Sequence, residues 1–130
     1  MRLTKTTDFA LRLLIYLAAT KNQPETMPRL AEKLKIPYNN LSKLVQALHK
    51  REIIQTQQGK NGGIRLMRPA EQITLKDVIE GVEGPTHFSD CLNDETFCSM
   101  NNLCKLKGVF HDVQMQINHI FEQVKITSML

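Results

Sequence analysis

The sequence has no tryptophan and few aromatic residues of any kind. Two tyrosines and five phenylalanines are spread over 130 residues. So small a number argues against a ligand pocket lined by aromatic rings. The four histidines form no recognisable nucleophile–base arrangement, and the glycine-rich segment 59–63 does not open a helix as a phosphate-binding loop would. We therefore expect that the protein is not an enzyme.

The sequence also lacks a long hydrophobic run. Its longest apolar run, residues 13–19, is far shorter than the roughly 20 residues that a membrane-spanning helix needs. Asp8 and Arg12 interrupt the approach to this run, which is not typical of a signal peptide. We expect a cytoplasmic protein with no membrane partner, whose thiols are reduced or metal-bound.

Positive charge is scarce in the second half of the chain. Residues 69–130 carry four Lys/Arg and nine Asp/Glu, a net charge of −5, whereas residues 1–68 carry thirteen and four, a net charge of +9. A basic first half favours a polyanionic partner such as DNA, although an uneven solvated surface would give the same totals.

The first half has the pattern of a helix-turn-helix. A helix is expected from Thr6 or Thr7, as its cap, to about Thr20. A short helix after Thr26 and a third from about Tyr38 to Arg51 are joined by a tight turn at 35–37. The third helix has an apolar stripe on one face and amide and lysine side chains on the other, as recognition helices do.

A β-hairpin follows the third helix. Strands are expected at 53–57 and 64–66, with the turn at 59–63, and such a hairpin is a wing. Amides on the third helix suit base edges, whereas basic residues suit phosphates or a narrow minor groove. The expected DNA-binding residues are Arg2, Lys5, Tyr38, Asn39, Asn40, Ser42, Lys43, Gln46, Lys50, Lys60 and Arg65.

The last helix has the clearest periodicity. Apolar residues from Leu103 to Val124 recur at alternating spacings of three and four, a heptad seam with no second seam in the chain to pair with. This pattern predicts a homodimer, although the seam could instead pack on the chain's own N-terminal part. A helix capped by Thr74 and Asp77 precedes it, and residues 127–130 are expected to fray.

All three cysteines, Cys91, Cys98 and Cys104, lie within fourteen residues. Their separations of six and five intervening residues are wider than those of most zinc sites. Three such thiolates can hold an iron–sulfur cluster, while zinc, a thiol switch or an idle third cysteine remain alternatives. A cluster needs a fourth ligand, and the candidates are Asp8, His87, Asp90, Asp94, Glu95 and His111.

Four motifs together resemble the Rrf-type iron–sulfur transcription regulators, and within them the nitric-oxide-sensing repressors. They are MRLTKTTDFALR at 1–12, PYNN at 37–40, GKNGGIRL at 59–66 and the three-cysteine segment. The resemblance implies a mostly α fold: a winged helix-turn-helix with a small β-hairpin wing, followed by a long C-terminal dimerisation helix. The corresponding boundaries are 1–84 for the DNA-binding domain, 85–104 for the cluster loop and 105–130 for the dimerisation helix.

The resemblance also implies a cofactor and a signal. A 4Fe–4S cluster, in preference to 2Fe–2S, is expected on the three cysteines, with Asp8 of the other subunit as its fourth ligand. Nitric oxide would damage the cluster and release a two-fold-symmetric operator. Lys107 stands where relatives that control cluster assembly carry a ligating histidine, and Gln58 where relatives carry a wing arginine.

Other functions remain compatible with the residues. The same cluster could sense iron, oxygen or redox state. A zinc-stabilised dimeric interaction module, or a cluster protein that binds no DNA, would share parts of the pattern.

Overall fold

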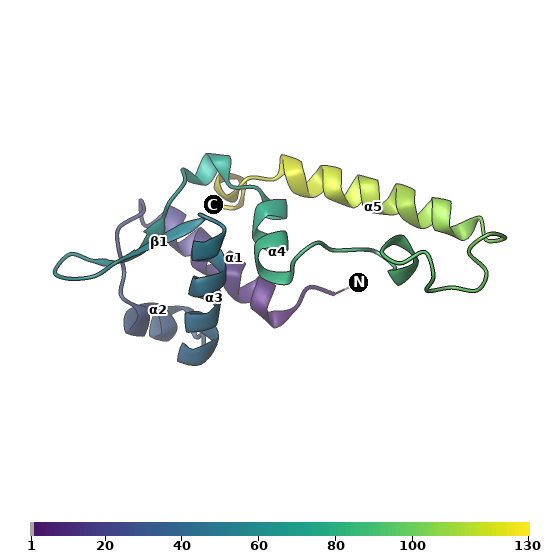
Figure 1. Ribbon diagram of the computed structural model, residues 1–130. Helices are drawn as coiled ribbons and strands as arrows, with labels where there is room; N and C mark the ends of the chain where they lie inside the picture. The colour runs from purple at the N-terminus through teal and green to yellow at the C-terminus, as the bar shows by residue number, and fades with distance from the viewer. Residues whose placement is uncertain (1) are drawn as a thin grey trace.

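The computed structural model describes residues 2–130, and it is mostly helical with one small antiparallel sheet (Figure 1). The predicted fold class, a winged helix-turn-helix with a long C-terminal helix, is confirmed. The helices are α1 (Lys5–Ala19), α2 (Met27–Leu34), α3 (Tyr38–Lys50), α4 (Leu75–Glu83) and α5 (Leu106–Gln123). The strands are β1 (Ile54–Gln57) and β2 (Gly63–Leu66), and the 3₁₀ turns are η1 (Ala70–Gln72), η2 (Asp90–Leu92) and η3 (Ile126–Met129).

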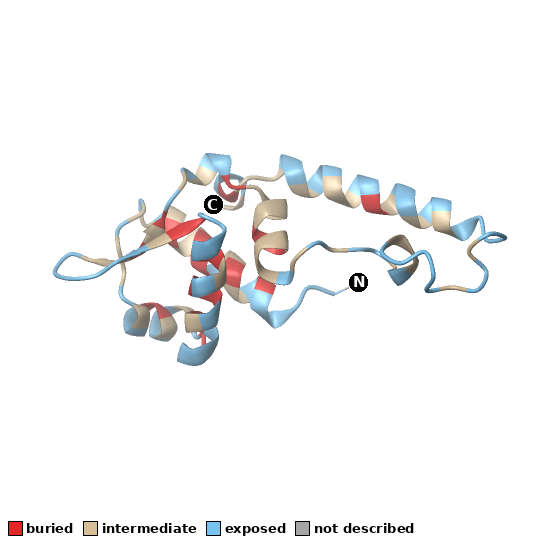
Figure 2. Ribbon diagram, viewed as in Figure 1, coloured by how far each residue is buried: buried red, intermediate tan, exposed pale blue. Residues whose placement is uncertain are grey.

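The hydrophobic core lies at one end of the molecule, where α1, α3, α4 and the hairpin meet (Figure 2). α1 supplies its centre, because Leu13, Leu14 and Leu17 are fully buried. By contrast, α5 and the segment 85–104 extend away from this core, and their residues are mostly exposed or half-buried. Among residues 2–130, no helix is both long and apolar enough to cross a membrane.

α1 begins earlier than the sequence indicated. Its cap is Thr4, whose hydroxyl oxygen accepts a hydrogen bond from the Thr7 amide at 3.2 Å. Thr7, one of the two predicted caps, lies inside the helix and is fully buried. The prediction of Thr6 or Thr7 as the cap was wrong, because several threonines in succession offer similar caps and tertiary packing selects among them.

The helix-turn-helix is built as predicted. α2 ends at Lys35, which adopts a left-handed conformation with φ 53°, and Pro37 precedes α3. Thr26 occupies the cap position of α2 without a side-chain capping hydrogen bond. The wing strands pair antiparallel, with Ile54 opposite Leu66 and Gln57 opposite Gly63.

The end of the chain folds back onto the core. Ile126 is fully buried, and its amide donates to the Ile73 carbonyl at 3.0 Å. η3 thereby packs against α1 and η1. The expectation that residues 127–130 fray was wrong for 127–129, because these residues belong to η3 and Met129 packs against the core. Local sequence patterns do not reveal this tertiary site.

Some residues of the heptad seam of α5 pack against the chain itself, and others are exposed to solvent. The helix begins at Leu106, so Leu103 lies before it and is 80% exposed, and Val124 is its C-cap. Phe110 packs edge-on against Phe88 of the preceding segment, with ring centroids 5.3 Å apart. Part of the predicted seam therefore packs on the chain itself, since Ile117 also lines a hollow with Ile79 and Glu83 of α4. Leu106 and Ile120 face outward.

Candidate DNA-binding surface and cysteine cavity

α3 presents a polar face opposite its buried side chains. Leu41, Leu44, Val45 and Leu48 point into the core, which leaves the intervening positions to solvent. Those positions are Tyr38, Asn39, Asn40, Lys43, Gln46 and Lys50, all exposed, and Ser42, which is half-buried. The structure brings these seven predicted residues together on one helix, where amide and ammonium groups can reach base edges and phosphates.

The wing separates its two predicted basic residues. Lys60 is exposed in the turn between the strands, whereas Arg65 lies on β2 and is half-buried. An Arg65 Nη2 atom donates to Gln57 Oε1 at 3.2 Å, and its buried Nε has no hydrogen-bond partner within residues 2–130. Arg65 lines a hollow at the base of the wing together with Lys21 and Arg68, and no α3 residue lines that hollow.

The first two predicted basic residues lie at the start of α1. Arg2 and Lys5 are exposed and line a shallow hollow with Asp8. The Asp8 carboxylate forms an ion pair with Arg12 one turn further along α1, at 2.6 Å, and both side chains are about half exposed. Asp8 is therefore accessible to another molecule, but it does not line the cavity that holds the cysteines of its own chain.

The three cysteines line one cavity of about 180 Å³ at the far end of the molecule. Cys91 lies in η2, Cys98 lies in the middle of the loop, and Cys104 lies just before α5. Cys91 and Cys98 are half-buried and Cys104 is exposed. The other lining residues are Ser89, Phe97, Asn101, Leu106, Lys107 and Phe110.

Local hydrogen bonds shape the loop around this cavity. Asp94 accepts from the amide and the hydroxyl of Thr96 at 2.8 and 2.7 Å, which holds the pKa of Asp94 below its usual value. Asn101 donates to the Glu95 carbonyl at 3.0 Å and accepts from Lys107 Nζ at 3.2 Å. The loop between Cys98 and Cys104 is thus braced to the first turn of α5.

The three thiols are arranged around one cavity and do not meet at a single point. No group of three Cys, His, Asp or Glu side chains converges on a single point anywhere in residues 2–130. The three thiols are spaced around one cavity, with Phe97 and Phe110 in its wall. This arrangement suits an iron–sulfur cluster, in which each thiolate can bind a different iron. Cys91, Cys98 and Cys104 would hold it, and they leave one ligand to come from elsewhere.

Some of the other proposed fourth ligands share a neighbouring hollow. His87, Glu95 and His111 line it together with Cys104 and Lys107. Asp90 and Asp94 line neither this hollow nor the cysteine cavity. Lys107 lines both cavities.

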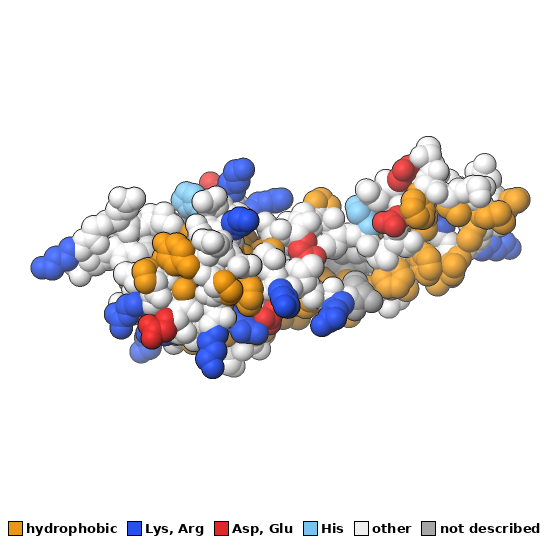
Figure 3. All heavy atoms as spheres, turned by 90° about the horizontal axis from the view of Figure 1, so that it is seen from below, with side chains coloured by type: hydrophobic (Ala, Val, Ile, Leu, Met, Phe, Trp, Pro, Cys, Tyr) orange, Lys and Arg blue, Asp and Glu red, His pale blue; other side chains and the backbone are white. Residues whose placement is uncertain are grey.

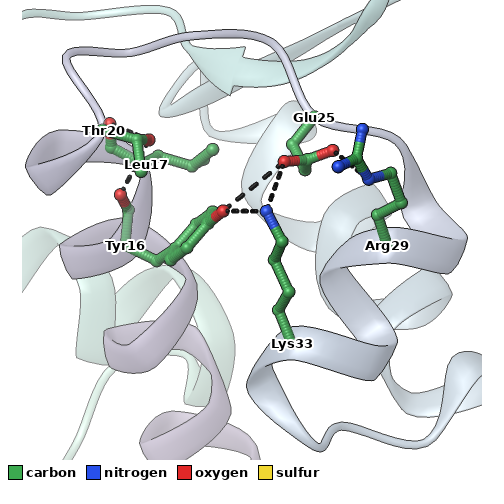
Figure 4. Close-up of polar contacts among 6 residues, drawn as sticks. All are labelled: Tyr16, Leu17, Thr20, Glu25, Arg29 and Lys33. Atoms are coloured by element: carbon green, nitrogen blue, oxygen red, sulfur yellow. Dashed lines mark hydrogen bonds and ion pairs between the residues drawn. The ribbon is translucent and has the colours of Figure 1, made fainter.

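A polar cluster that sequence reasoning missed surrounds Glu25 (Figure 4). Its carboxylate contacts Lys33 Nζ at 3.1 Å, Arg29 Nε at 3.3 Å and the Tyr16 hydroxyl at 3.4 Å. Partial burial acts to raise the pKa of Glu25, but the hydrogen bond from Lys33 and the two cationic charges outweigh it, so the pKa is lowered. The spacing of Glu25, Arg29 and Lys33 by four residues was the signal available in the sequence.

Charge is distributed unevenly over the molecular surface. Seen from below, most of the Lys and Arg side chains lie over the wing, the helix-turn-helix and the start of the chain, while a band of hydrophobic side chains follows one edge of the end with α5 and the cysteine loop (Figure 3). The apolar end includes Phe97 (60% exposed) and Met100 (52% exposed).

Comparison with known proteins relates the chain to transcriptional regulators. The family model Rrf2, described as an iron-dependent transcriptional regulator, matches residues 3–130. The chain is 36% identical to the HTH-type transcriptional regulator NsrR of Shouchella clausii, covering 100% of this chain and 89% of that protein. It is 37% identical to the regulator of that name from Halalkalibacterium halodurans, covering 100% and 90%. The solved structure of CymR, the global cysteine regulator of B. subtilis, has a TM-score of 0.79 at 17% identity, covering 99% of this chain and 95% of that one.

Proposed function

This chain belongs to the Rrf2 family of transcriptional regulators, and from that premise we propose that it is a DNA-binding repressor that responds to nitric oxide through an iron–sulfur cluster. The observation that carries the proposal is the single cavity lined by all three cysteines, at the far end of a protein whose other end is a basic winged helix.

The polar face of α3 and the wing are the DNA-contacting elements in this proposal. Asn39, Asn40 and Lys43 lie in the N-terminal part of α3, the part of a recognition helix that reaches base edges. Lys60, in the wing turn, would contact phosphate or the adjacent minor groove. The exposure of these side chains supports the assignment, because they are free to approach a duplex without unfolding anything.

Two copies of the chain would associate along the outward side of α5. Leu106, Val109 and Ile120 on that side are 49%, 55% and 58% exposed. A stripe of apolar residues of this length is unfavourable in water and is covered in a homodimer. Such a dimer would place two reading helices on the half-sites of a two-fold-symmetric operator.

The cluster would be held by Cys91, Cys98 and Cys104, with Asp8 reaching in from the partner subunit. Asp8 is half exposed and outside its own chain's cysteine cavity, which supports a role between subunits. When bound, the cluster supplies iron that reacts with nitric oxide. A carboxylate is a hard ligand beside soft thiolates, so Asp8 would form the most labile of the four bonds.

Asp8 would also connect the cysteine cavity to DNA. It lies on α1, whose buried leucines pack directly against the helix-turn-helix. Release of Asp8 would remove the bond between the first turn of α1 and the partner's cysteine loop and allow the two DNA-binding domains to shift relative to each other. Because half-site spacing is geometrically fixed, a small shift lowers operator affinity.

Anaerobic purification followed by iron and sulfide analysis tests the proposal. Wild-type protein is expected to carry a cluster, and serine at any one of the three cysteines is expected to prevent its retention. Asp8→Ala is expected to bind the cluster less stably, while Asp112→Asn, which removes an exposed carboxylate from α5, serves as its control. Protein without iron or sulfide, or an operator affinity that nitric oxide leaves unchanged, would refute the proposal.

A further inference from the structure

We propose that Arg29 and Lys33, on α2, form a clamp for a DNA backbone phosphate, and that Glu25 holds the clamp in position. Neither residue belongs to the polar face of α3 or to the wing, so this is a third DNA contact. The inference rests on the DNA-binding part of the proposed function, but not on the cluster or on nitric oxide.

The two cations keep hydrogen-bonding capacity that the protein does not use. Arg29 contacts Glu25 through Nε at 3.3 Å, no hydrogen bond from either terminal nitrogen of its guanidinium group is found within residues 2–130, and its side chain is 67% exposed. Lys33 contacts Tyr16 at 2.9 Å and Glu25 at 3.1 Å, and an ammonium group has three protons to donate. A forked guanidinium beside an ammonium group is well suited to phosphate oxygens.

Glu25 fixes these side chains without cancelling their charge. Its side chain is only 14% exposed, and its contacts to Arg29 and Lys33 restrict two otherwise flexible side chains. One carboxylate against two cations leaves a net charge of +1 on the cluster. The Lys33 ammonium lies at the hydroxyl end of the Tyr16 ring, and this contact links α2 to α1 (Figure 4).

Backbone hydrogen bonds hold the clamp at a fixed position relative to the wing. The amide of Glu25 donates to the Ile64 carbonyl at 3.2 Å, and the Ile64 amide donates to the Glu25 carbonyl at 2.8 Å. α2 also packs on α3. The residue that orders the two cations therefore touches the wing, and the helix that carries them touches the recognition helix. In helix-turn-helix proteins, the first helix of the motif crosses the DNA backbone.

Salt dependence of DNA binding tests the clamp directly. The probe is a duplex that the wild-type protein selects from a random DNA pool. For Arg29→Ala or Lys33→Ala, the slope of log affinity against log salt is expected to be less steep by about 0.9 per lost phosphate contact. The wild-type-to-variant affinity ratio should accordingly fall by about threefold between 50 and 200 mM salt.

Lys105→Ala is the matched control, because it removes one exposed positive charge at the other end of the molecule. Its slope is expected to equal that of the wild type. Failure of the wild-type protein to select any duplex would refute DNA binding itself. An unchanged slope in both α2 variants of a DNA-binding protein would refute only the clamp.

The Glu25→Gln variant distinguishes two effects of Glu25 on DNA affinity: orienting the Arg29 and Lys33 side chains, and adding a negative charge to the DNA-binding surface. Removing a negative charge from a DNA-binding surface should strengthen binding if only long-range attraction matters. If Glu25 positions Arg29 and Lys33, the variant should bind several-fold more weakly despite its higher net charge, when both proteins are compared at a temperature where circular dichroism shows them fully folded. Tighter binding by Glu25→Gln would overturn the positioning role.

Discussion

The carboxylate of Glu83 accepts a hydrogen bond from the buried hydroxyl of Thr7, seventy-six residues earlier in the chain. Glu83 is the last residue of α4 and directly precedes the segment that leads to the cysteines. Thr7 lies in the first turn of α1, next to Asp8. The Thr4 hydroxyl donates to the same carboxylate oxygen at 2.6 Å. The beginning of α1 is thus attached to the point from which the cysteine loop departs.

This attachment predicts an acid-sensitive contribution to stability. Hydrogen bonds from Thr4 and Thr7 lower the pKa of Glu83 below its ordinary value of 4.5. A carboxylate with a depressed folded-state pKa stabilises the protein above the unfolded pKa, and the contribution disappears as pH falls through the folded value. Because Glu83 is exposed, solvent screens much of this contribution, so Glu83→Gln should lower the free energy of unfolding by only about 0.5 kcal/mol at pH 7, and by progressively less in acid.

Urea denaturation at pH 7 and at acidic pH measures this difference. Glu80→Gln is the control on the same helix, because Glu80 has only a 3.9 Å surface ion pair with Lys76. A loss in Glu83→Gln that is the same at both pH values would contradict the assignment.

The buried end of the chain predicts a large stability effect from a residue near the terminus. Ile126 is fully buried among the core side chains. Ile126→Ala should cost about 2–5 kcal/mol, since it removes buried methyl groups and leaves a cavity. Thermal or urea unfolding measures the loss. Leu130→Ala, at a side chain that is 63% exposed, should have little effect. Equal effects of the two variants would show that η3 is not part of the cooperative core.

Gly63 at the root of the wing predicts a substitution that damages both stability and DNA binding. Its φ of +142° disfavours any other residue, and a Cβ there would lie 2.7 Å from the carbonyl oxygen of Glu25. Gly63→Ala should therefore push the wing away from Glu25. Gly108→Ala provides a control of opposite sign, because its Cβ would meet nothing within 4 Å and alanine favours a helix by about 1 kcal/mol. Melting temperature and affinity for a selected duplex are the measurements.

The outward side of α5 predicts which substitutions prevent dimerisation. Val109→Glu and Ile120→Glu each place a charge on the apolar stripe and should shift the protein to monomers in analytical ultracentrifugation. Met115→Glu is the control, because Met115 is as exposed as Val109, at 55%, but lies off that stripe. Dimers that persist in both stripe variants would place the subunit contact elsewhere.

Patterns that depend on neighbouring residues were predictable from the sequence. The capping box at Thr74 and Asp77, the turn before Tyr38 and the hairpin around residues 59–63 are local, and the structure contains each of them. The interactions that form each of these features involve residues close together in the sequence, so predicting them needs no knowledge of the tertiary structure.

Features that depend on distant residues were not predictable in this way. Ile126 finds its site against α1, and Phe110 turns toward Phe88 in place of a second subunit. Glu25 meets Tyr16 and Ile64 only after the chain has folded. The three cysteines share a cavity whose wall includes Asn101, and the hydrogen bonds of Asn101 to Glu95 and Lys107 could not be predicted from the cysteine spacing.

The return of the chain at Ile126 has a mechanical consequence. The buried Ile126 attaches the C-terminal end of α5 to the DNA-binding domain. The N-terminal end of α5, just after Cys104, lies far from the core. The eighteen residues of α5 span roughly 27 Å, so a tilt of about 5° at its clamped end would move the far end by about 2 Å. α5 thus has the geometry of a lever arm, in which a small tilt at the core corresponds to a larger displacement beside Cys104.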